Sequence, residues 1–121
     1  MVCVAVVDDD VTFVDLVVEV LGMEGYDVLT YYQSDGTFAL LRDAQPDLII
    51  LDVRLEHRDS GWQLLELIRL DPVTAGIPLI ACSADAAQLS ARKQWLDEQG
   101  ILTLFKPFDL DELLDLIALR C

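Results

Sequence analysis

Carboxylates, a hydroxyl and an amine stand at the ends of four apolar runs of this 121-residue chain. Residues 8–10 are three consecutive aspartates, Asp52 closes a later run, and Ser83 and Lys106 close two more. Carboxylates that converge repel one another unless a hard cation binds between them, and oxygen ligands suit Mg²⁺. A carboxylate beside such a cation can attack a phosphoryl group while an ammonium neutralises its oxygens. These residue types therefore indicate metal-assisted phosphoryl transfer.

The pattern of apolar residues predicts a fold that would bring these side chains together. Continuous apolar runs, typical of parallel strands buried on both faces, occupy residues 2–7, 27–32, 47–53, 77–84 and 101–105. Amphipathic helices lie between them; the first carries its apolar side chains at helical spacing, at Phe13, Leu16, Val17, Val20 and Leu21. Five strands alternating with five helices predict one α/β domain over residues 1–121, a doubly wound five-stranded parallel sheet.

Capping residues and helix breakers predict where the helices begin and end. We expect Asp10 to lie at a helix start or to add outer charge to the site, Ser34 or Asp35 to cap the second helix and Asp109 to cap the last. The third helix should begin at Ser60 or Gly61 and end near Asp71 and Pro72. Gly22 and Gly25 should stop the first.

In a doubly wound sheet the loops that leave the carboxyl ends of the strands meet at one edge, where sites are built. Asp8, Asp9, Asp52, Ser83 and Lys106 all follow such strand ends. Each has an ordinary structural explanation by itself, such as capping a helix or completing a turn. Their occurrence together at one edge favours a functional site.

Composition limits the class of protein. There are 22 acidic against 8 basic residues, and the net charge of −14 opposes direct binding to nucleic acid. No apolar stretch is long enough to span a membrane, so we expect a cytoplasmic protein. Cys3, Cys82 and Cys121 lack metal-ligand spacing, which favours small buried side chains over a disulfide or zinc site.

The segments VVDDD, LIILDV, IPLIACSA and FKPF, in this order over nearly the whole chain, resemble the receiver domain of two-component response regulators. The resemblance implies a flavodoxin-like sheet in strand order 2-1-3-4-5. It implies that Asp52 is the phosphoacceptor, that Asp9 and Asp52 bind Mg²⁺ directly, that Asp8 binds it through water, and that the backbone carbonyl of Arg54 completes the protein ligands.

The same resemblance assigns the remaining roles. Ser83 would be the hydroxyl that moves toward the phosphoryl group, and Lys106 would pair with that group beside a cis bond to Pro107. The donor would be a sensor histidine kinase or a histidine phosphotransfer protein. A downstream protein would bind the face formed by the fourth helix, fifth strand and fifth helix. Such a chain is a switch rather than a turnover enzyme.

Three departures from the receiver pattern concern the same edge. The loop from Leu55 to Gly61 lacks a common proline and is one residue longer than usual. Thr103 stands where a switch aromatic is common. Arg54 and Asp85 occupy the two variable positions that tune the lifetime of the phosphoryl group, and an ion pair between them could screen attacking water.

Two other functions stay open. DDDVT also reads as the first motif of haloacid-dehalogenase-like phosphatases, with Asp8 as nucleophile and Asp10 as acid/base. A receiver-like module that binds partners without phosphorylation is the third hypothesis. The complete acidic set counts against that module.

Two smaller features keep two interpretations each. Val11, Val14 and Val18 with Phe108 could form a docking patch for a helical donor or extend the core. Trp95 could belong to the output surface or to the core. His57, the only histidine, is interpreted as a surface residue.

Overall fold

The computed structural model describes residues 1–55 and 59–121. Its five strands form one parallel sheet in the order β2-β1-β3-β4-β5. The bounds of the strands are β1 (Cys3–Val7), β2 (Asp27–Tyr31), β3 (Leu48–Asp52), β4 (Leu79–Ser83) and β5 (Leu102–Phe105). The predicted doubly wound fold and its strand order are confirmed.

The part of the chain that the structure describes contains six helices, one more than predicted. They are α1 (Val11–Met23), α2 (Thr37–Ala44), α3 (Ser60–Leu70), α4 (Ala86–Ala91), α5 (Lys93–Glu98) and α6 (Leu110–Arg120). The extra helix arises at Arg92, whose φ of −108° and ψ of 8° interrupt the helical geometry. The predicted fourth helix is therefore divided into α4 and α5.

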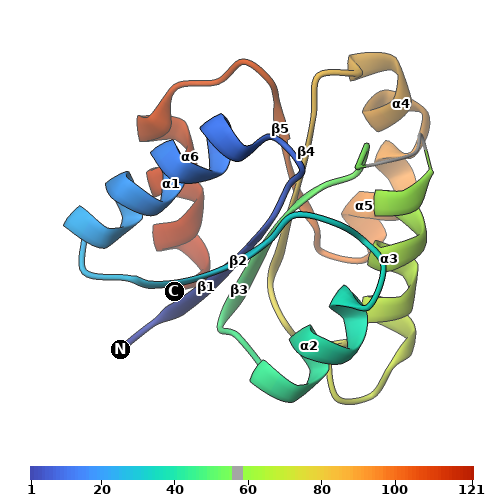
Figure 1. Cartoon of the computed structure of the whole chain (residues 1–121). Coiled ribbons are helices and arrows are strands. Elements are labelled where there is room, and N and C mark those ends of the chain that lie inside the picture. The colour runs from blue at the N-terminus through green and yellow to red at the C-terminus, as the bar shows by residue number, and fades with distance from the viewer. Residues whose placement is uncertain (56–58) are drawn as a thin grey trace.

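Helices cover both faces of the sheet, as the continuous apolar strands require (Figure 1). On one face α1 and α6 pack on the sheet through Val14, Val17, Leu21, Leu113 and Ile117. On the other face α2, α3, α4 and α5 do so through Leu41, Trp62, Leu65, Leu89 and Leu96, among others. Because β3 and β4 are buried along their whole length, every side chain that ends them is held firmly.

Three predicted helix starts are confirmed. The carboxylate of Asp10 is the N-cap of α1 and accepts a hydrogen bond from the Phe13 N–H at 3.1 Å. Asp109 and Glu112 form a capping box at the start of α6. Helix α3 begins at Ser60 and ends before Asp71, as predicted.

Other predicted boundaries were wrong. The N-cap position of α2 is held by Gly36, whose φ of 75° favours glycine, and not by the predicted Ser34 or Asp35. The Thr37 hydroxyl instead donates to the Gln33 carbonyl and closes this turn. Gly22 lies inside α1 and does not stop it, whereas Gly25, with φ of 88°, follows the C-cap residue Glu24 at the helix end.

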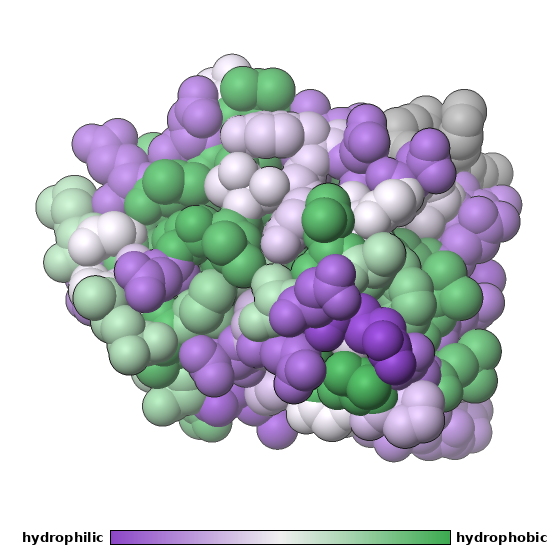
Figure 2. Space-filling view, turned by 60° about the horizontal axis from the view of Figure 1, so that its bottom comes forward, coloured by the Kyte–Doolittle hydropathy of each residue, from purple (hydrophilic) through white to green (hydrophobic). Residues whose placement is uncertain are grey.

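The end of the molecule where the strands begin has a surface of mixed hydropathy. Figure 2 brings forward the end of the molecule where the strands begin, and hydrophobic residues there lie in several areas separated by hydrophilic ones.

Of the cysteines, Cys82 is fully buried as predicted, but Cys121 is exposed, which corrects the prediction for that residue. Within residues 1–55 and 59–121, every helix is too short or too polar to cross a membrane.

Candidate functional site

Four strands deliver the predicted site residues to the same edge of the sheet. Asp8 and Asp9 follow β1, Asp52 ends β3, Ser83 ends β4 and Lys106 follows β5. Carboxylate oxygens of Asp8, Asp9 and Asp52 lie within 4.8 Å of one another. Asp8 and Asp52 are buried, with 2% and 8% of their surface exposed, whereas Asp9 is exposed. A cluster of buried carboxylates costs free energy unless positive charge compensates it.

Lys106 supplies part of that compensation. Its ammonium donates hydrogen bonds to Oδ2 of Asp8 and, at 2.9 Å, to Oδ2 of Asp52. Only 18% of the lysine side chain is exposed. Burial lowers the pKa of Lys106, but the two carboxylates outweigh burial, and the pKa is raised above its ordinary value. The side chain is therefore a permanent cation at neutral pH.

The backbone places this lysine at the end of the last sheet strand. The Lys106 N–H donates to the Ser83 carbonyl at 2.9 Å, which continues the pairing of β4 with β5. The peptide bond to Pro107 is cis, as the resemblance implied. The ammonium thus reaches carboxylates from β1 and β3 although it enters from the far side of β4.

The carboxylate of Asp52 is held at both oxygens. Oδ1 accepts the Arg54 N–H at 2.8 Å, and Oδ2 accepts the ammonium of Lys106. Burial raises the pKa of Asp52 and the charge of Asp8 adds to this, while the hydrogen bonds from Lys106 and Arg54 lower it; the net direction is upward. Ionising the Asp52 carboxylate therefore costs free energy in this position. A further cation at the site would lower that free energy cost.

The three consecutive aspartates have different surroundings. Oδ1 of Asp8 accepts the Asp10 N–H at 3.0 Å, which orients the Asp8 carboxylate into the site. The Asp10 carboxylate itself caps α1 and lies outside the cluster of acidic groups. Helix capping is thus the role of Asp10, and the alternative of outer charge at the site is not needed.

Ser83 is buried, with 1% of its surface exposed, beside the acidic cluster. Its hydroxyl oxygen accepts the Asp85 N–H at 2.9 Å, and the Asp85 carboxylate accepts the Gln88 N–H and caps α4. Cys82, the residue before Ser83, pairs in register with Asp52. Ser83 therefore follows directly on the residue that lies across from Asp52 in the sheet.

Two predicted departures from the receiver pattern can be located. Thr103 lies on β5, two residues before the end of that strand; it pairs with Ala81 of β4 and is partly buried. Within the described residues, Arg54 and Asp85 form no ion pair, since Asp85 is engaged as a helix cap and Arg54 is exposed. His57 and part of the loop from Leu55 to Gly61 lie outside the described residues.

Sequence reasoning missed the contact that fixes the base of the site. Gly61, in the first turn of α3, lies directly against the backbone of β3 and the residue after it. A Cβ on Gly61 would stand 2.4 Å from the carbonyl oxygen of Asp52 and from Cα of Val53. A glycine near a predicted helix start carries no signal for this close approach, which only the packing of α3 on the strand reveals.

An aromatic contact with Lys106 was also missed. The Nζ atom of Lys106 lies 4.2 Å from the ring centroid of Phe13. The Phe13 ring in turn meets the Phe108 ring edge to face, with centroids 5.8 Å apart and an interplanar angle of 87°. In the sequence Phe13 was only the first member of the apolar stripe of α1, and 93 positions separate it from Lys106.

The donor set fits Mg²⁺. Oxygen ligands from Asp8, Asp9 and Asp52 lie close enough to share one small cation, and no nitrogen or sulfur ligand is part of the group. Mg²⁺ prefers one or a few carboxylates and keeps water or phosphate oxygens in its other positions. The exposed position of Asp9 leaves room for such ligands.

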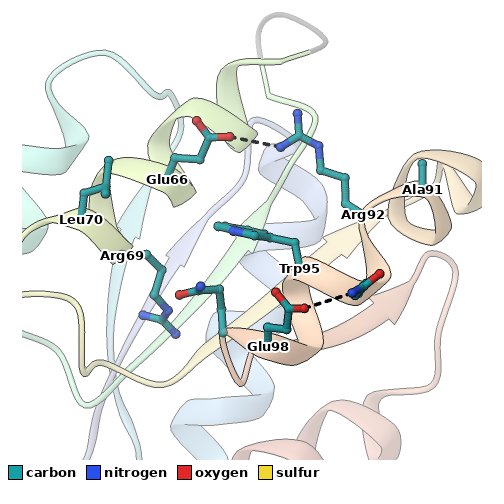
Figure 3. A pocket seen from close by; sticks show the side chains of 9 residues that line it. Glu66, Arg69, Leu70, Ala91, Arg92, Trp95 and Glu98 are labelled. Carbon is teal, nitrogen blue, oxygen red and sulfur yellow. Dashed lines mark hydrogen bonds and ion pairs between the residues drawn. The ribbon is translucent and has the colours of Figure 1, made fainter.

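Two hollows lie outside the acidic cluster. One, of about 800 Å³, lies between α3 and α5; Figure 3 shows the Trp95 ring pointing across it toward α3. Trp95 also packs on the core, so both interpretations of this residue hold in part. None of the predicted site residues lines this groove. The other, of about 310 Å³, is apolar and lies beside Lys106 between Phe13, Leu16 and Phe108.

The suggested docking patch on α1 changes its membership. Val14 is fully buried, and Val18 and Phe108 pack on the same core while partly exposed. Val11 is 55% exposed. The core interpretation is therefore correct for Val14, and the apolar surface beside the site is formed by the residues of the smaller hollow.

Comparisons with known proteins agree with this geometry. Over residues 4–118 the sequence matches the family described as "Response regulator receiver domain". The DNA-binding dual master transcriptional regulator RpaA of Synechocystis sp. is 37% identical over 111 residues, which are 92% of this chain and 45% of that protein. The phosphate regulon transcriptional regulatory protein PhoB of Pseudomonas aeruginosa is 30% identical over 110 residues, 91% of this chain and 47% of that protein.

Solved structures resemble the whole chain. The receiver domain of NtrX from Brucella abortus is 30% identical and superposes with a TM-score of 0.79, covering 97% of this chain and 95% of that one. The non-phosphorylated receiver domain of HemR from Leptospira biflexa is 25% identical with a TM-score of 0.86, covering 99% and 94%. The chain spans less than half the length of the curated relatives it matches.

Proposed function

Because the chain belongs to the response regulator receiver domains, we propose that it is a phosphoacceptor signalling switch in which Asp52 takes up the phosphoryl group. One observation carries the choice of Asp52. Its carboxylate ends a central, fully buried strand and shares the ammonium of Lys106 with Asp8. Asp52 therefore combines a fixed position at the end of a buried strand, a negative charge that costs free energy there, and an adjacent cation.

The chemistry follows from these contacts. An oxygen of the Asp52 carboxylate attacks phosphorus while the bond from phosphorus to the donor nitrogen breaks, and the donor nitrogen keeps the electron pair of that bond. Lys106 neutralises charge on the transferred oxygens, and the Ser83 hydroxyl donates to one of them. Bound Mg²⁺ would stabilise the remaining phosphoryl charge. We assign Asp8, Asp9, Asp52 and the backbone carbonyl of Arg54 to hold it.

The partners follow from the receiver class. The phosphoryl donor is a sensor histidine kinase or a histidine phosphotransfer protein, and the apolar hollow at Phe13, Leu16 and Phe108 lies beside the site where such a donor would dock. The surface whose binding partner changes on phosphorylation is formed by α4, α5, β5 and α6. These elements correspond to the face expected from the sequence, in which α4 and α5 were one helix. We place this chemistry in the cytoplasm, as expected for a domain served by such kinases.

Nucleic-acid binding is described for relatives that are longer than this chain. RpaA is described as DNA-binding, but this chain covers only 45% of that protein. Such relatives give no support to the expectation that this chain avoids nucleic acid, which rests on its charge of −14 alone. Organisation as a single receiver domain over residues 1–121 stays a prediction.

The structure disfavours the phosphatase alternative. In that mechanism Asp10 must act as acid/base near Asp8, yet the Asp10 carboxylate accepts the Phe13 N–H at the start of α1. Asp8 is also tied to Lys106 and to the Asp10 N–H. If the chain were a module that binds partners without phosphorylation, the cluster of Asp8, Asp9 and Asp52 would have no function.

Intact mass spectrometry tests the proposal. The chain is incubated with phosphoramidate or acetyl phosphate, with and without Mg²⁺, as wild type, Asp52→Asn and Asp8→Asn. We expect a Mg²⁺-dependent phosphoryl adduct that is absent in Asp52→Asn and weaker in Asp8→Asn. Catalytic hydrolysis of the donor that survives Asp52→Asn but not Asp8→Asn would establish the phosphatase instead. No reaction in any variant would leave the phosphorylation-independent module.

A further inference from the structure

The ammonium of Lys106 is enclosed by an aromatic ring as well as by carboxylates. Its Nζ lies 4.2 Å from the ring centroid of Phe13. An ammonium within about 6 Å of a ring face is attracted by the ring quadrupole, more strongly where water is excluded. Only 18% of the lysine side chain is exposed, so the condition of partial desolvation is met.

The geometry leaves one donor of the ammonium for this contact. A lysine ammonium has three N–H groups. Two are used by Oδ2 of Asp8 and Oδ2 of Asp52. The Phe13 ring therefore covers a side of the ammonium on which water would otherwise compete for the third N–H.

Contacts with Asp10, near the start of the chain, and with Phe108, near its end, hold Phe13 in place. Its N–H is fixed by the Asp10 cap at the start of α1. Its ring packs edge to face against Phe108, two residues after Lys106 and directly after the cis proline. Two residues of the segment 106–108 thus contact the Phe13 ring. The ammonium of Lys106 lies near the ring centroid, and the Phe108 ring packs at about a right angle to it.

We infer that Phe13 is a positioning residue for Lys106, and that the electrostatic attraction of its ring keeps the ammonium aimed at the Asp52 oxygens during phosphoryl transfer. The inference rests on the proposed function of Asp52. The ring acts through Lys106. As negative charge passes from the Asp52 carboxylate to the transferred phosphoryl oxygens, the ammonium can pair with those oxygens while it stays in contact with the Phe13 ring. Preorganised charge of this kind lowers the barrier because little rearrangement is needed as the transition state forms.

The ring quadrupole, rather than the bulk of the side chain, is the property to be changed. Fluorination of a phenylalanine ring withdraws charge from its face with little change in shape. The test installs phenylalanine carrying one, two or three ring fluorines at position 13, and Phe13→Leu removes the ring. The same series at Phe38, a partly buried phenylalanine that packs on the opposite face of the sheet, is the matched control.

Two readouts separate the contact from its consequence. The first is the rate of the Asp52 adduct with phosphoramidate at saturating Mg²⁺, measured by intact mass. The second is the NMR shift of the lysine ε-CH₂ groups in the metal-free, unphosphorylated protein. The chain has two lysines, so Lys93, which is exposed and pairs with Asp97, serves as an internal reference.

We expect the ε-CH₂ protons of Lys106 to lie upfield of those of Lys93 because of the ring current, and to lose this shift in Phe13→Leu. The phosphorylation rate should fall stepwise with each fluorine, and about fivefold in Phe13→Leu, which corresponds to about 1 kcal/mol. The series at Phe38 should leave both readouts unchanged.

Each other result overturns the inference in a distinct way. If Lys106 shows no ring-current shift, the contact does not exist in solution. If the shift is present and Asp52 is phosphorylated at one rate across the fluorine series, the ring only fills space. If the wild type shows the shift but forms no Asp52 adduct, the proposed function fails, and the positioning role fails with it.

Discussion

Gly61 lies so close to Asp52 that a single added carbon at Gly61 would stand 2.4 Å from the Asp52 carbonyl oxygen. Helix α3 therefore begins in direct backbone contact with the strand end that carries the proposed phosphoacceptor. The position of Asp52 therefore depends on this contact as well as on the strand pairing of β3.

Replacing Gly61 by alanine should damage both the fold and the site. Because the clash is with backbone atoms, either α3 or the end of β3 must move, and overpacking of this kind typically costs about 1–3 kcal/mol. We expect Gly61→Ala to lower the free energy of unfolding in urea by this amount and to slow formation of the Asp52 adduct. Gly22→Ala is the control, since a Cβ there meets nothing within 4 Å. That change should stabilise α1 by about 0.5–1 kcal/mol.

Lys106 and Mg²⁺ should compete for the same oxygens. The lysine ammonium binds Oδ2 of both Asp8 and Asp52, two of the proposed ligands. Removing its charge in Lys106→Met should therefore strengthen Mg²⁺ binding, on the order of tenfold by Coulomb's law at this range. Isothermal titration calorimetry measures the affinity, and Lys93→Met, which removes an exposed ion pair, is the control. Equal or weaker binding by Lys106→Met would contradict this prediction.

The raised pKa of Asp52 predicts a pH-dependent cost in the metal-free protein. Between the ordinary value of 3.8 and the raised value, the folded state binds more protons than the unfolded state, so stability falls as pH rises through this window. Asp52→Asn cannot ionise and escapes this cost. In EDTA we expect its advantage in unfolding free energy over the wild type to grow from near pH 4 upward and to reach a plateau. A constant difference between pH 3 and pH 8 would refute the direction of the shift.

Asp10 should matter to the helix and little to the chemistry. Loss of an N-cap side chain costs about 0.5–2 kcal/mol, so Asp10→Ala should lower the free energy of unfolding by that amount. Asp15→Ala, an exposed position inside α1, should change stability far less. The Asp52 adduct should still form in Asp10→Ala. Its loss under conditions where the variant is fully folded would restore Asp10 as a chemical participant.

The sequence alone determined the sheet, its order of elements and the edge at which the polar residues gather. Continuous apolar runs such as 47–53 specify strands buried on both faces, and a polar residue at the end of such a run can only emerge at the carboxyl edge. For this reason the pattern of residue types is sufficient to place Asp8, Asp52, Ser83 and Lys106 together.

Only the tertiary structure decided the contacts made across the chain. The pairing of Lys106 with Asp8, the ring of Phe13 beside that lysine and the approach of Gly61 to Asp52 each join different elements through the packing of their side chains and backbones. Local patterns of hydrophobicity carry no information on such contacts, because distance and orientation across the fold arise only when the helices are packed on the sheet. The break at Arg92 was not predicted either, because its neighbours read as one continuous helix; in the structure its guanidinium lies over Trp62 of α3, 4.7 Å from the ring centroid.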